Sequence, residues 1–370
     1  MTECSRCVMR SADDPDLVLV DGVCNHCRRY DDLLTSRVVT GEEGATELNQ
    51  IAGGIKGSGR KEFDCVIGVS GGVDSTYVAL KAVELGLRPL AVHVDNGWNS
   101  EVAVQNIEKT LNALDIELHT VVLDLREFYD LQRSFLFAST PDGEIPTDHA
   151  IQATLWKTAR QNGIRTIISG MNFRTEAISV PSWSYGHSDW RYIRGVQRRH
   201  GTRSLATYPH FGFGELGYVT AVRRIRVLSI LNYLDYDKAA AVDELQAKLN
   251  WTPYGGKHYE SIYTRWYQGH VLPQKFGIDK RRGHYSDLIN SGQICRSDAL
   301  LGLAQPDYDD DLRDRDQQFV LKKLSLSSAQ FDEIMAAPVR SFRDYPNSYE
   351  TVQRLRGLAN GLRHRGWYPK

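Results

Sequence analysis

Short apolar runs rich in β-branched residues alternate with amphipathic stretches between residues 64 and 170. The runs at 65–69, 90–94, 116–122 and 165–170 have the length of strands, and the apolar runs 65–69 and 90–94 predict buried strands. The stretches 73–86, 100–114 and 147–162 carry apolar residues at helical spacing and predict helices between these strands. The alternation predicts an α/β fold, in which a doubly wound parallel sheet is covered by helices on both faces.

The pattern changes on either side of this region. Residues 1–30 hold four cysteines and little periodicity, and the glycine-rich residues 40–60 predict a short weak helix with a Gly/Ser-rich connector. Beyond residue 235 strand patterns stop, and amphipathic segments predict a helical C-terminal region. We therefore predict three parts: a cysteine-bearing segment with its connector (1–57), the α/β domain (58–235) and a helical substrate or partner domain (236–370). The helices predicted in the last part are 237–249, 260–271, 287–291, 296–303, 311–324, 328–336 and 349–362.

The composition adds little to this picture except by exclusion. Of 370 residues, 41% are hydrophobic and 25% are charged, and 45 Lys and Arg against 46 Asp and Glu give a net charge of −1. A chain this close to neutral has no overall attraction to nucleic acid or to an acidic membrane surface. The chain opens without a basic stretch and apolar run, and no segment approaches the ~20 apolar residues of a membrane helix, which predicts a cytoplasmic protein.

Four cysteines near the start of the chain have the spacing of a zinc site. Cys4 and Cys7 form one Cys-x2-Cys pair, and Cys24 and Cys27 form a second pair sixteen residues later. In a reducing compartment such pairs favour metal ligation over disulfides. Four thiolates complete the tetrahedral coordination of Zn²⁺, so we predict a structural zinc ribbon rather than a catalytic metal centre. His26 is predicted to lie beside the site without ligating the ion.

The turn after the first predicted strand has the composition of a phosphate-binding loop. It reads Val-Ser-Gly-Gly-Val-Asp-Ser and stands directly between a strand and a helix, but it is neither a Walker motif nor Gly-x-Gly-x-x-Gly. Two glycines allow backbone N–H groups to surround an anion, the serines add hydroxyl donors, and the helix N-terminus adds partial positive charge. Asp74 cannot bind phosphate directly, so its presence predicts a divalent cation between the carboxylate and the phosphates. The predicted loop residues are Val69, Ser70, Gly71, Gly72, Val73, Asp74 and Ser75.

This loop resembles that of the PP-loop ATP pyrophosphatases, the adenine nucleotide alpha hydrolase-like superfamily, over about residues 60–180. The resemblance implies that ATP is cleaved between its α- and β-phosphates, that a carbonyl oxygen of the substrate is adenylated, and that a nitrogen or sulfur nucleophile then displaces AMP. It also implies that the end of the second strand, at His93 and Asp95, contacts adenine and ribose. All of these residues follow parallel strands at their carboxyl ends, where open α/β sheets bind ligands.

The end of the fourth strand, residues 169–176, is similar to the Gly-Thr-x-Asn-x-Ser-Glu stretch of NAD synthetases. This second resemblance implies that Gly170 approaches the α-phosphate and that Glu176 holds Mg²⁺ together with Asp74. The alternative for Glu176 is an exposed carboxylate at a helix start. The implied nucleotide-binding residues of this segment are Gly170, Asn172 and Thr175.

Two basic segments in the C-terminal region add candidate phosphate ligands. Lys257 lies between glycines and aromatic residues, and Lys280 is followed directly by Arg281 and Arg282. Lys and Arg stabilise a pyrophosphate leaving group, and Arg binds phosphate or carboxylate through two donors. We predict that both segments are loops that meet a ligand, with a solvated basic face as the alternative. A further basic cluster is predicted to be a solvated or interface face of a helix: Arg191, Arg194, Arg198, Arg199 and Arg203.

These motifs occur in one order, and together with Thr147-Asp148-His149 they make the chain similar to the N-acetyl sugar amidotransferase family, of the WbpG and PseA type. The resemblance implies ATP-dependent conversion of an acetamido group of a nucleotide-linked amino sugar into an acetamidino group, with release of AMP and pyrophosphate, in lipopolysaccharide O-antigen or flagellar glycan biosynthesis. The implied cofactors are ATP, Mg²⁺ and structural Zn²⁺. In this interpretation Lys257, Arg281 and Arg282 neutralise phosphate or grip the sugar, and Asp148 and His149 contact the substrate or transfer a proton.

The same resemblance bears on partners. The chain lacks a Gly-x-Cys-x-Gly elbow and an N-terminal cysteine nucleophile, so ammonia is expected from a separate glutaminase, with a cyclase-like channel subunit, as in the two halves of imidazole glycerol phosphate synthase. Two alternatives remain open at this point: a PP-loop tRNA-modifying enzyme of the thiolation or lysidine type, and a zinc-ribbon interaction subunit without catalysis. The neutral charge argues against tRNA binding, and the intact loop argues against a subunit without catalysis.

Overall fold

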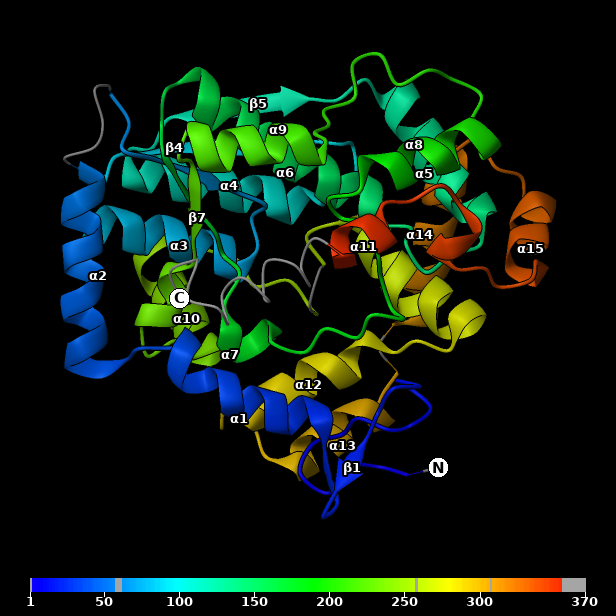
Figure 1. Ribbon diagram of the computed structural model, residues 1–370, viewed down its shortest axis with the longest axis horizontal. Helices are drawn as coiled ribbons and strands as arrows, with labels where there is room; N and C mark the ends of the chain where they lie inside the picture. Colours follow the sequence, from blue (N-terminus) through cyan, green and yellow to red (C-terminus); the bar gives the residue numbers. More distant parts are fainter. Residues whose placement is uncertain (1, 57–61, 257–258, 307, 355–370) are drawn as a thin grey trace.

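The computed structural model describes residues 2–56, 62–256, 259–306 and 308–354, and it is built around a five-stranded parallel sheet (Figure 1). The strand order is β5-β4-β3-β6-β7, which confirms the predicted doubly wound α/β fold. The short strand β7 was not predicted, because three residues beginning with an arginine carry no recognisable period. The strands are β3 (Cys65–Gly68), β4 (Pro89–Asp95), β5 (Leu118–Val122), β6 (Thr166–Ile168) and β7 (Arg226–Leu228).

Alternate residues of the central strands enter two separate cores, which is why these strands are largely apolar. Ile67 and Ile168 pack on one face with the helices α2 (Gly41–Lys56), α3 (Val73–Glu84) and α4 (Glu101–Leu114). Val66 and Ile167 pack on the other face with α6 (Ile145–Gln161) and the π-helical turn η1 (Tyr218–Val222).

The sheet has a switch point between β3 and β6. Strand β3 pairs with β4 on one side and with β6 on the other, so the winding of the chain reverses between them. In open parallel sheets ligands bind outside the carboxyl ends of the strands at such a point. The glycine-rich loop follows β3, and the segment that leads to α7 (Phe173–Glu176) follows β6, so the fold brings the two predicted nucleotide-binding motifs to this point.

Helix α2 corrects the prediction of a short weak helix with a connector, since it runs unbroken for 16 residues through Gly53 and Gly54. Leu48, Ala52 and Ile55 recur at helical spacing and are buried against the sheet. This packing outweighs the low helix propensity of the two glycines. The rest of the predicted connector, residues 57–61, lies outside the described part of the chain.

The region beyond residue 235 is helical, as predicted. One segment differs: α12 begins at Lys280 rather than near residue 287, because Asp279 caps it and accepts a hydrogen bond from the backbone N–H of Arg281 at 3.0 Å. Lys280, Arg281 and Arg282 therefore lie in a helical first turn, and the prediction of a loop here was wrong. Of the predicted helix 349–362, residues 349–354 are described, and they are helical. The elements of this region are α10 (Lys238–Leu249), α11 (Ile262–Trp266), η3 (Tyr267–Phe276), α12 (Lys280–Asn290), α13 (Arg296–Ala304), α14 (Asp310–Lys323), α15 (Ser328–Ala336) and η4 (Phe342–Asp344).

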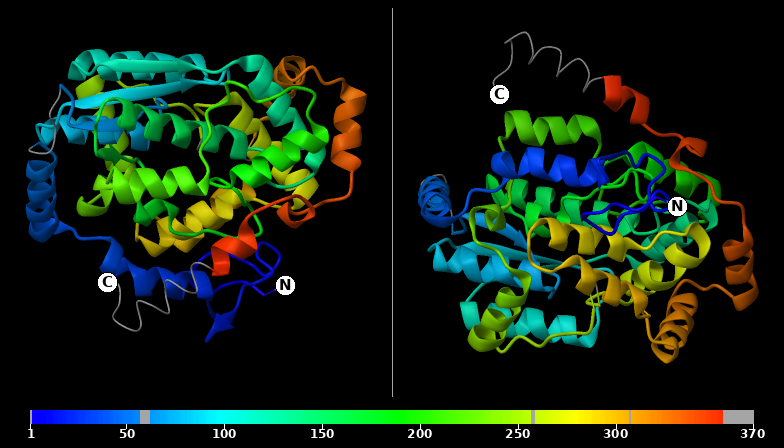
Figure 2. Two further views of the ribbon diagram at one scale, coloured as in Figure 1. Left: turned by 45° about the horizontal axis from the view of Figure 1, so that its top comes forward. Right: turned by 90° about the horizontal axis from the view of Figure 1, so that it is seen from below.

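The N-terminal segment lies against α12 and α13, far from it in sequence (Figures 1 and 2). Helix α1 begins within the second cysteine pair, since Cys24 is its N-cap and Cys27 lies in its first turn, and it contacts α12. In the described residues no helix is both long and apolar enough to cross a membrane. The remaining elements are β1 (Leu19–Val20), β2 (Val23–Cys24), α1 (Asn25–Arg37), α5 (Leu125–Ala138), α8 (Trp190–His200), α9 (Phe213–Gly217) and η2 (Ile230–Tyr233).

Candidate functional site

The loop after β3 is held in one shape by its own hydrogen bonds. Ser75 Oγ donates to the carbonyl of Gly72 at 3.1 Å and accepts from the N–H of Ser70 at 3.3 Å. Gly71 has a φ of +80°, and a Cβ there would stand 2.3 Å from the carbonyl oxygen of Ala103, so only glycine fits. Helix α3 begins after Gly72 with no side-chain cap, which leaves the donors of its first turn available to an anion.

A cavity of about 300 Å³ lies over this loop. The loop forms its floor, and Tyr254 closes it from above, since its hydroxyl would be 3.0 Å from a Cβ on Gly72. Lys238, at the first residue of α10, adds a cation to the wall. Sequence reasoning missed Lys238, because a lysine at a helix start carries no signal of its own. The other lining residues include Ser70, Asp74, Ser75, Trp251, Glu260 and His284.

The two carboxylates predicted to hold Mg²⁺ come close to one hydroxyl group. Tyr236 donates a hydrogen bond to Asp74 Oδ1. Burial raises the pKa of Tyr236 most, and the charges of Asp74 and Glu176 raise it further. Gly170, after β6, packs closely against the loop after β3, since a Cβ there would lie 3.3 Å from the backbone nitrogen of Ser75. Carboxylate oxygens at the edge of a phosphate loop suit Mg²⁺, so these residues fit the ion.

Four further residues predicted to bind the nucleotide make hydrogen bonds with the backbone or with one another at the site. His93 Nδ1 lies 2.9 Å from the carbonyl oxygen of Val69, which ties the loop to β4. Asp95 accepts a hydrogen bond from the N–H of Gly97 at 2.9 Å. The side chain of Asn172 caps α7 and accepts from the N–H of Thr175 at 3.0 Å. Contact of these residues with adenine or ribose stays a prediction.

A second cavity, of about 340 Å³, adjoins the first. His284 lines both, and the neighbours Tyr259 and Glu260 line one cavity each. Thr175 and Glu176 form the wall of the second cavity toward α7. Its cations are paired with carboxylates: Arg281 with Asp279 at 2.8 Å, Lys280 with Glu144 at 3.1 Å, and Arg265 with Asp316 at 2.7 Å.

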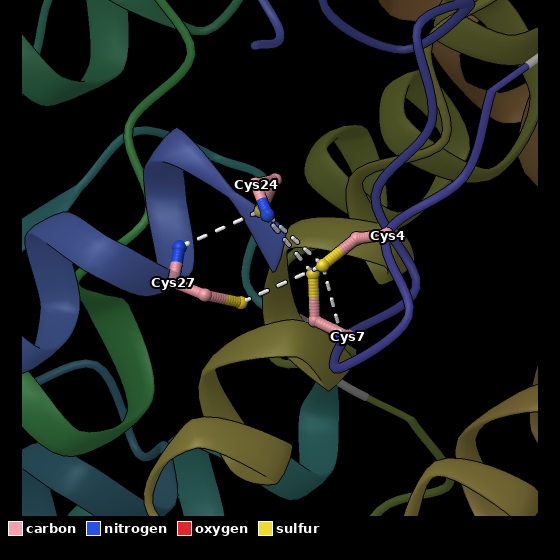
Figure 3. A group of neighbouring side chains, drawn as sticks. All are labelled: Cys4, Cys7, Cys24 and Cys27. Atoms are coloured by element: carbon pink, nitrogen blue, oxygen red, sulfur yellow. Dashed lines mark hydrogen bonds between the residues drawn. The ribbon is translucent and has the colours of Figure 1, made fainter. Parts of the chain in front are cut away.

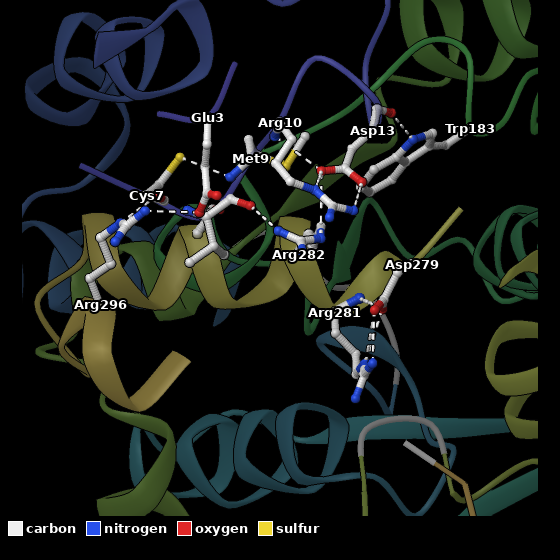
Figure 4. Close-up of polar contacts among 12 residues, drawn as sticks. Glu3, Cys7, Met9, Arg10, Asp13, Trp183, Asp279, Arg281, Arg282 and Arg296 are labelled. Carbon is white, nitrogen blue, oxygen red and sulfur yellow. Dashed lines mark hydrogen bonds and ion pairs between the residues drawn. The ribbon is translucent and has the colours of Figure 1, made fainter. Parts of the chain in front are cut away.

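Adjacent arginines of α12 face opposite ways (Figure 4). Arg281 lines the second cavity, whereas Arg282 donates to the carbonyl of Val8 at 2.7 Å and lies 3.6 Å from Asp13. Arg296, on α13, donates to the carbonyl of Cys7 at 3.0 Å. The described contacts of Arg282 therefore hold the N-terminal segment rather than line a cavity. Lys257 lies outside the described residues.

The four cysteines of the N-terminal segment converge, as their spacing predicts (Figure 3). All are fully buried and free of disulfides, and their sulfur atoms lie within 4.8 Å of one another. The Cys7–Cys24 and Cys4–Cys27 sulfur distances are 3.7 and 4.0 Å. A tetrahedron with Zn–S bonds of about 2.3 Å has edges of about 3.8 Å, so the cluster fits Zn²⁺. His26 lies beside the cluster without joining it, as predicted, and its Nε2 is 2.7 Å from Oδ2 of Asp14.

Asp148 and His149 follow each other on α6 but face different surroundings. Asp148 Oδ2 lies 3.0 Å from Nδ1 of His187, a residue that lines the second cavity. His149 is fully buried and stacks on Phe211 with ring centroids 4.5 Å apart. Its Nδ1 donates to the carbonyl of His187 at 2.8 Å. Burial lowers the pKa of His149 to about 4, so this ring is a neutral core residue at pH 7.

The depressed pKa of His149 predicts acid sensitivity. The unfolded chain binds this proton near pH 6.5, whereas the native ring resists it until about pH 4. Between these values the unfolded state holds more protons, so the free energy of unfolding falls as the pH falls, by up to about 3 kcal/mol from this residue. Urea unfolding of wild type and His149→Gln between pH 7 and pH 4 measures the difference. Equal pH dependence of the two proteins would contradict the assignment.

The exposed basic cluster follows the predicted pattern for a helix face. Four of its arginines lie on α8, and all are exposed, while Tyr192, Ile193 and Val196 of the same helix are buried. Neither cavity is lined by these arginines.

Comparisons with known proteins complete the description of the site. Residues 260–356 match the family model described as "LPS biosynthesis protein WbpG-like, C-terminal domain". No curated protein sequence matches the chain. Among solved structures, the chain is similar to NMN synthetase from Francisella tularensis, at 16% identity over 81% of this chain and 97% of that chain, with a TM-score of 0.37. It is also similar to the predicted subunit of tRNA methyltransferase from Methanocaldococcus jannaschii DSM, at 14% identity over 50% of this chain and 75% of that chain, with a TM-score of 0.28.

Proposed function

We propose, from the premise that residues 260–356 are a WbpG-like C-terminal domain, that the protein is an ATP-dependent amidotransferase of surface-polysaccharide biosynthesis. Its substrate is an amino sugar with an N-acetyl group, carried on a nucleotide, and its product bears an acetamidino group. The observation that carries the proposal is the pair of adjoining cavities, one over the phosphate loop and one beside it. Two joined sites suit a reaction in which ATP must meet a second substrate.

The matched domain supplies the wall that the two cavities share. Glu260, Arg281 and His284 all lie within residues 260–356, and each lines one or both cavities. The loop and α7, on the opposite side, come from the α/β domain. The part of the chain that resembles a lipopolysaccharide biosynthesis protein is thus the part that shapes the space for the second substrate, which supports a sugar as that substrate.

The chemistry follows from the weakness of an amide as an electrophile. ATP lies in the first cavity with its phosphates on the loop, and the amide oxygen of the sugar, in the second cavity, attacks the α-phosphorus. The bond to the β-phosphate oxygen breaks, and the N–H groups of the first turn of α3 together with Lys238 stabilise the pyrophosphate that leaves. Mg²⁺, held by Asp74 and Glu176, supplies charge neutralisation for the phosphates.

Ammonia then attacks the activated carbon, and AMP leaves. Free ammonia is mostly protonated near pH 7, so a shielded supply raises its effective concentration. We propose that a separate glutaminase and a cyclase-like channel subunit deliver it, and that the reaction takes place in the cytoplasm, where ATP is available.

The test is direct detection of the product. The full chain is incubated with ATP, Mg²⁺, ammonium and a panel of nucleotide-linked diacetamido sugars, followed by high-resolution mass spectrometry. We expect AMP and, for one sugar, a product with NH in place of an acetamido oxygen, and no such product when ammonium is left out. AMP formation with every sugar unchanged would contradict a sugar acceptor and favour another carbonyl substrate.

A further inference from the structure

A serine, a histidine and an aspartate form a chain of hydrogen bonds at the second cavity. Nδ1 of His187 lies 3.0 Å from Oδ2 of Asp148, and Nε2 lies 3.1 Å from Oγ of Ser184. With the proton on Nδ1 donated to the carboxylate, Nε2 is free to accept one from the serine hydroxyl. This is the order of groups by which an aspartate orients a histidine that acts as a base.

The cavity places this chain of groups where the acceptor carbonyl is proposed to react. Ser184 and His187 line the second cavity, together with Glu176 of the proposed magnesium site. The side chain of His187 is 45% exposed, so a bound substrate can reach the ring.

The segment that carries the two residues is fixed on both sides. Before it, the indole of Trp183 is buried and donates to the carbonyl of Asp13 at 2.6 Å. Between them, the N–H of Tyr185 donates to Asp142 Oδ1 at 2.7 Å. The carbonyl of His187 itself accepts from the buried ring of His149 at 2.8 Å. The imidazole is therefore held in place before any substrate binds, as a proton-transfer group requires.

The charges around His187 adjust its basicity. Partial burial of the ring lowers its pKa, but the hydrogen bond and charge of Asp148 raise it more, and the net direction is upward. Asp142 raises the pKa as well, whereas Lys280 of α12 lowers it. His149, packed behind the segment, is neutral at pH 7. A histidine raised above its ordinary pKa is a stronger base when deprotonated.

We propose that His187, oriented by Asp148 and reached through Ser184 or directly, is the general base for the ammonia step. The inference rests on the proposed function and adds to it the group that takes the proton. The phosphate loop and Asp74 line only the first cavity, and Glu176, which lines the second, is assigned to the metal in the proposed function.

The step balances in atoms and charge. The nitrogen lone pair of ammonia forms a bond to the adenylated carbon while the C=N π pair of the O-adenylated amide moves to the sugar nitrogen, which gives a tetrahedral centre with a cationic –NH₃⁺ group. Nε2 of His187 takes one proton from this group. The lone pair of the remaining nitrogen then forms the C=N bond as the C–O bond breaks, AMP leaves with that electron pair, and the amidinium product remains.

The experiment separates adenylation from the ammonia step. Exchange of labelled pyrophosphate into ATP, dependent on the acceptor sugar, reports adenylation without ammonia, and mass spectrometry reports the amidine. We expect His187→Gln to keep the exchange within about threefold and to lose about a hundredfold in kcat for the amidine, as is typical for removal of a general base. Asp148→Asn should act in the same direction, and added imidazole should restore part of the His187→Gln rate.

The pH profile provides a readout that a structural role would not change. At a fixed concentration of free ammonia, kcat of the wild type should rise with pH through the pKa of His187, and this dependence should be absent in His187→Gln. His119→Gln, an exposed histidine on β5, is the matched control and should behave as wild type. If His187→Gln kept the kcat and the pH profile of the wild type, His187 would not be the general base. If the wild type showed no sugar-dependent exchange, the proposed function would fail together with this inference.

Discussion

Replacing Asp74 with asparagine is expected to lower the rate of AMP formation by about a thousandfold. The substitution keeps the shape of the side chain and its acceptor for the Tyr236 hydroxyl, so the loop should retain its structure. It removes a negative charge from a loop whose backbone N–H and hydroxyl groups are hydrogen-bond donors to an anion. Such a carboxylate serves phosphate binding only through a cation, and its loss should therefore weaken metal-dependent binding of the pyrophosphate group.

The measurement is AMP release with ATP, Mg²⁺, ammonium and the active acceptor, together with zinc content and a thermal unfolding curve. The matched control is Asp243→Asn, which removes an exposed carboxylate on α10 and should leave all three unchanged. If Asp74→Asn turned over at the normal rate, Asp74 would not be a ligand of the metal, and the reason for a carboxylate in this loop would have to be sought elsewhere.

Replacing Cys24 with serine is expected to abolish zinc binding and to unfold the N-terminal segment. Apolar residues of this segment, Met9 among them, belong to the same core cluster as the four cysteines. Structural Zn²⁺ contributes about 10–16 kcal/mol to the folding of comparable zinc-finger peptides. The effect should extend to the site, because Arg282 and Arg296 bind backbone carbonyls of this segment, and α12 carries Arg281 and His284 at the cavities. We therefore expect a higher KM for the acceptor as well as loss of the metal.

Zinc content by mass spectrometry, limited proteolysis of residues 2–37 and the acceptor KM measure these effects. Cys295→Ser is the matched control, since Cys295 is exposed and lies outside the cluster. It should keep the zinc and the KM of the wild type. If Cys24→Ser held zinc at the wild-type level, the four-thiolate site would be wrong.

Local patterns in the sequence predicted the sheet, the loop and the cysteine cluster because each is a local feature with a period or a spacing. Cys4, Cys7, Cys24 and Cys27 had to converge if they shared a metal, and they do. The strands that flank the switch point were largely apolar because both faces of the sheet are covered. The start of α12 was also readable, since Asp279 is a favoured N-cap residue, but the run of cations after it was interpreted as a ligand-binding loop.

The sequence placed Thr175, Glu176 and Arg281 at the site, but it could not predict which neighbours of such residues turn away from the second cavity. Neighbours on a helix point about 100° apart, so Asp148 contacts His187, which lines the cavity, while His149 enters an aromatic core. The same geometry separates Arg281 from Arg282. His187 carries no motif, and only the packing of its segment against α6 brings it to Asp148. The structure buries His149 in an aromatic core and pairs Asp148 with His187, and a role of Asp148 at the substrate stays a prediction.

The central claim is that the turn between β3 and α3 binds the phosphates of ATP so that AMP can be transferred to a carbonyl oxygen. A crystal structure with Mg²⁺ and an ATP analogue that resists cleavage between the α- and β-phosphates tests this most directly. The account predicts phosphate oxygens within hydrogen-bond distance of the backbone N–H groups of residues 70–75, with the metal on Asp74. An analogue bound elsewhere on the protein, with this turn free of ligand, would contradict it.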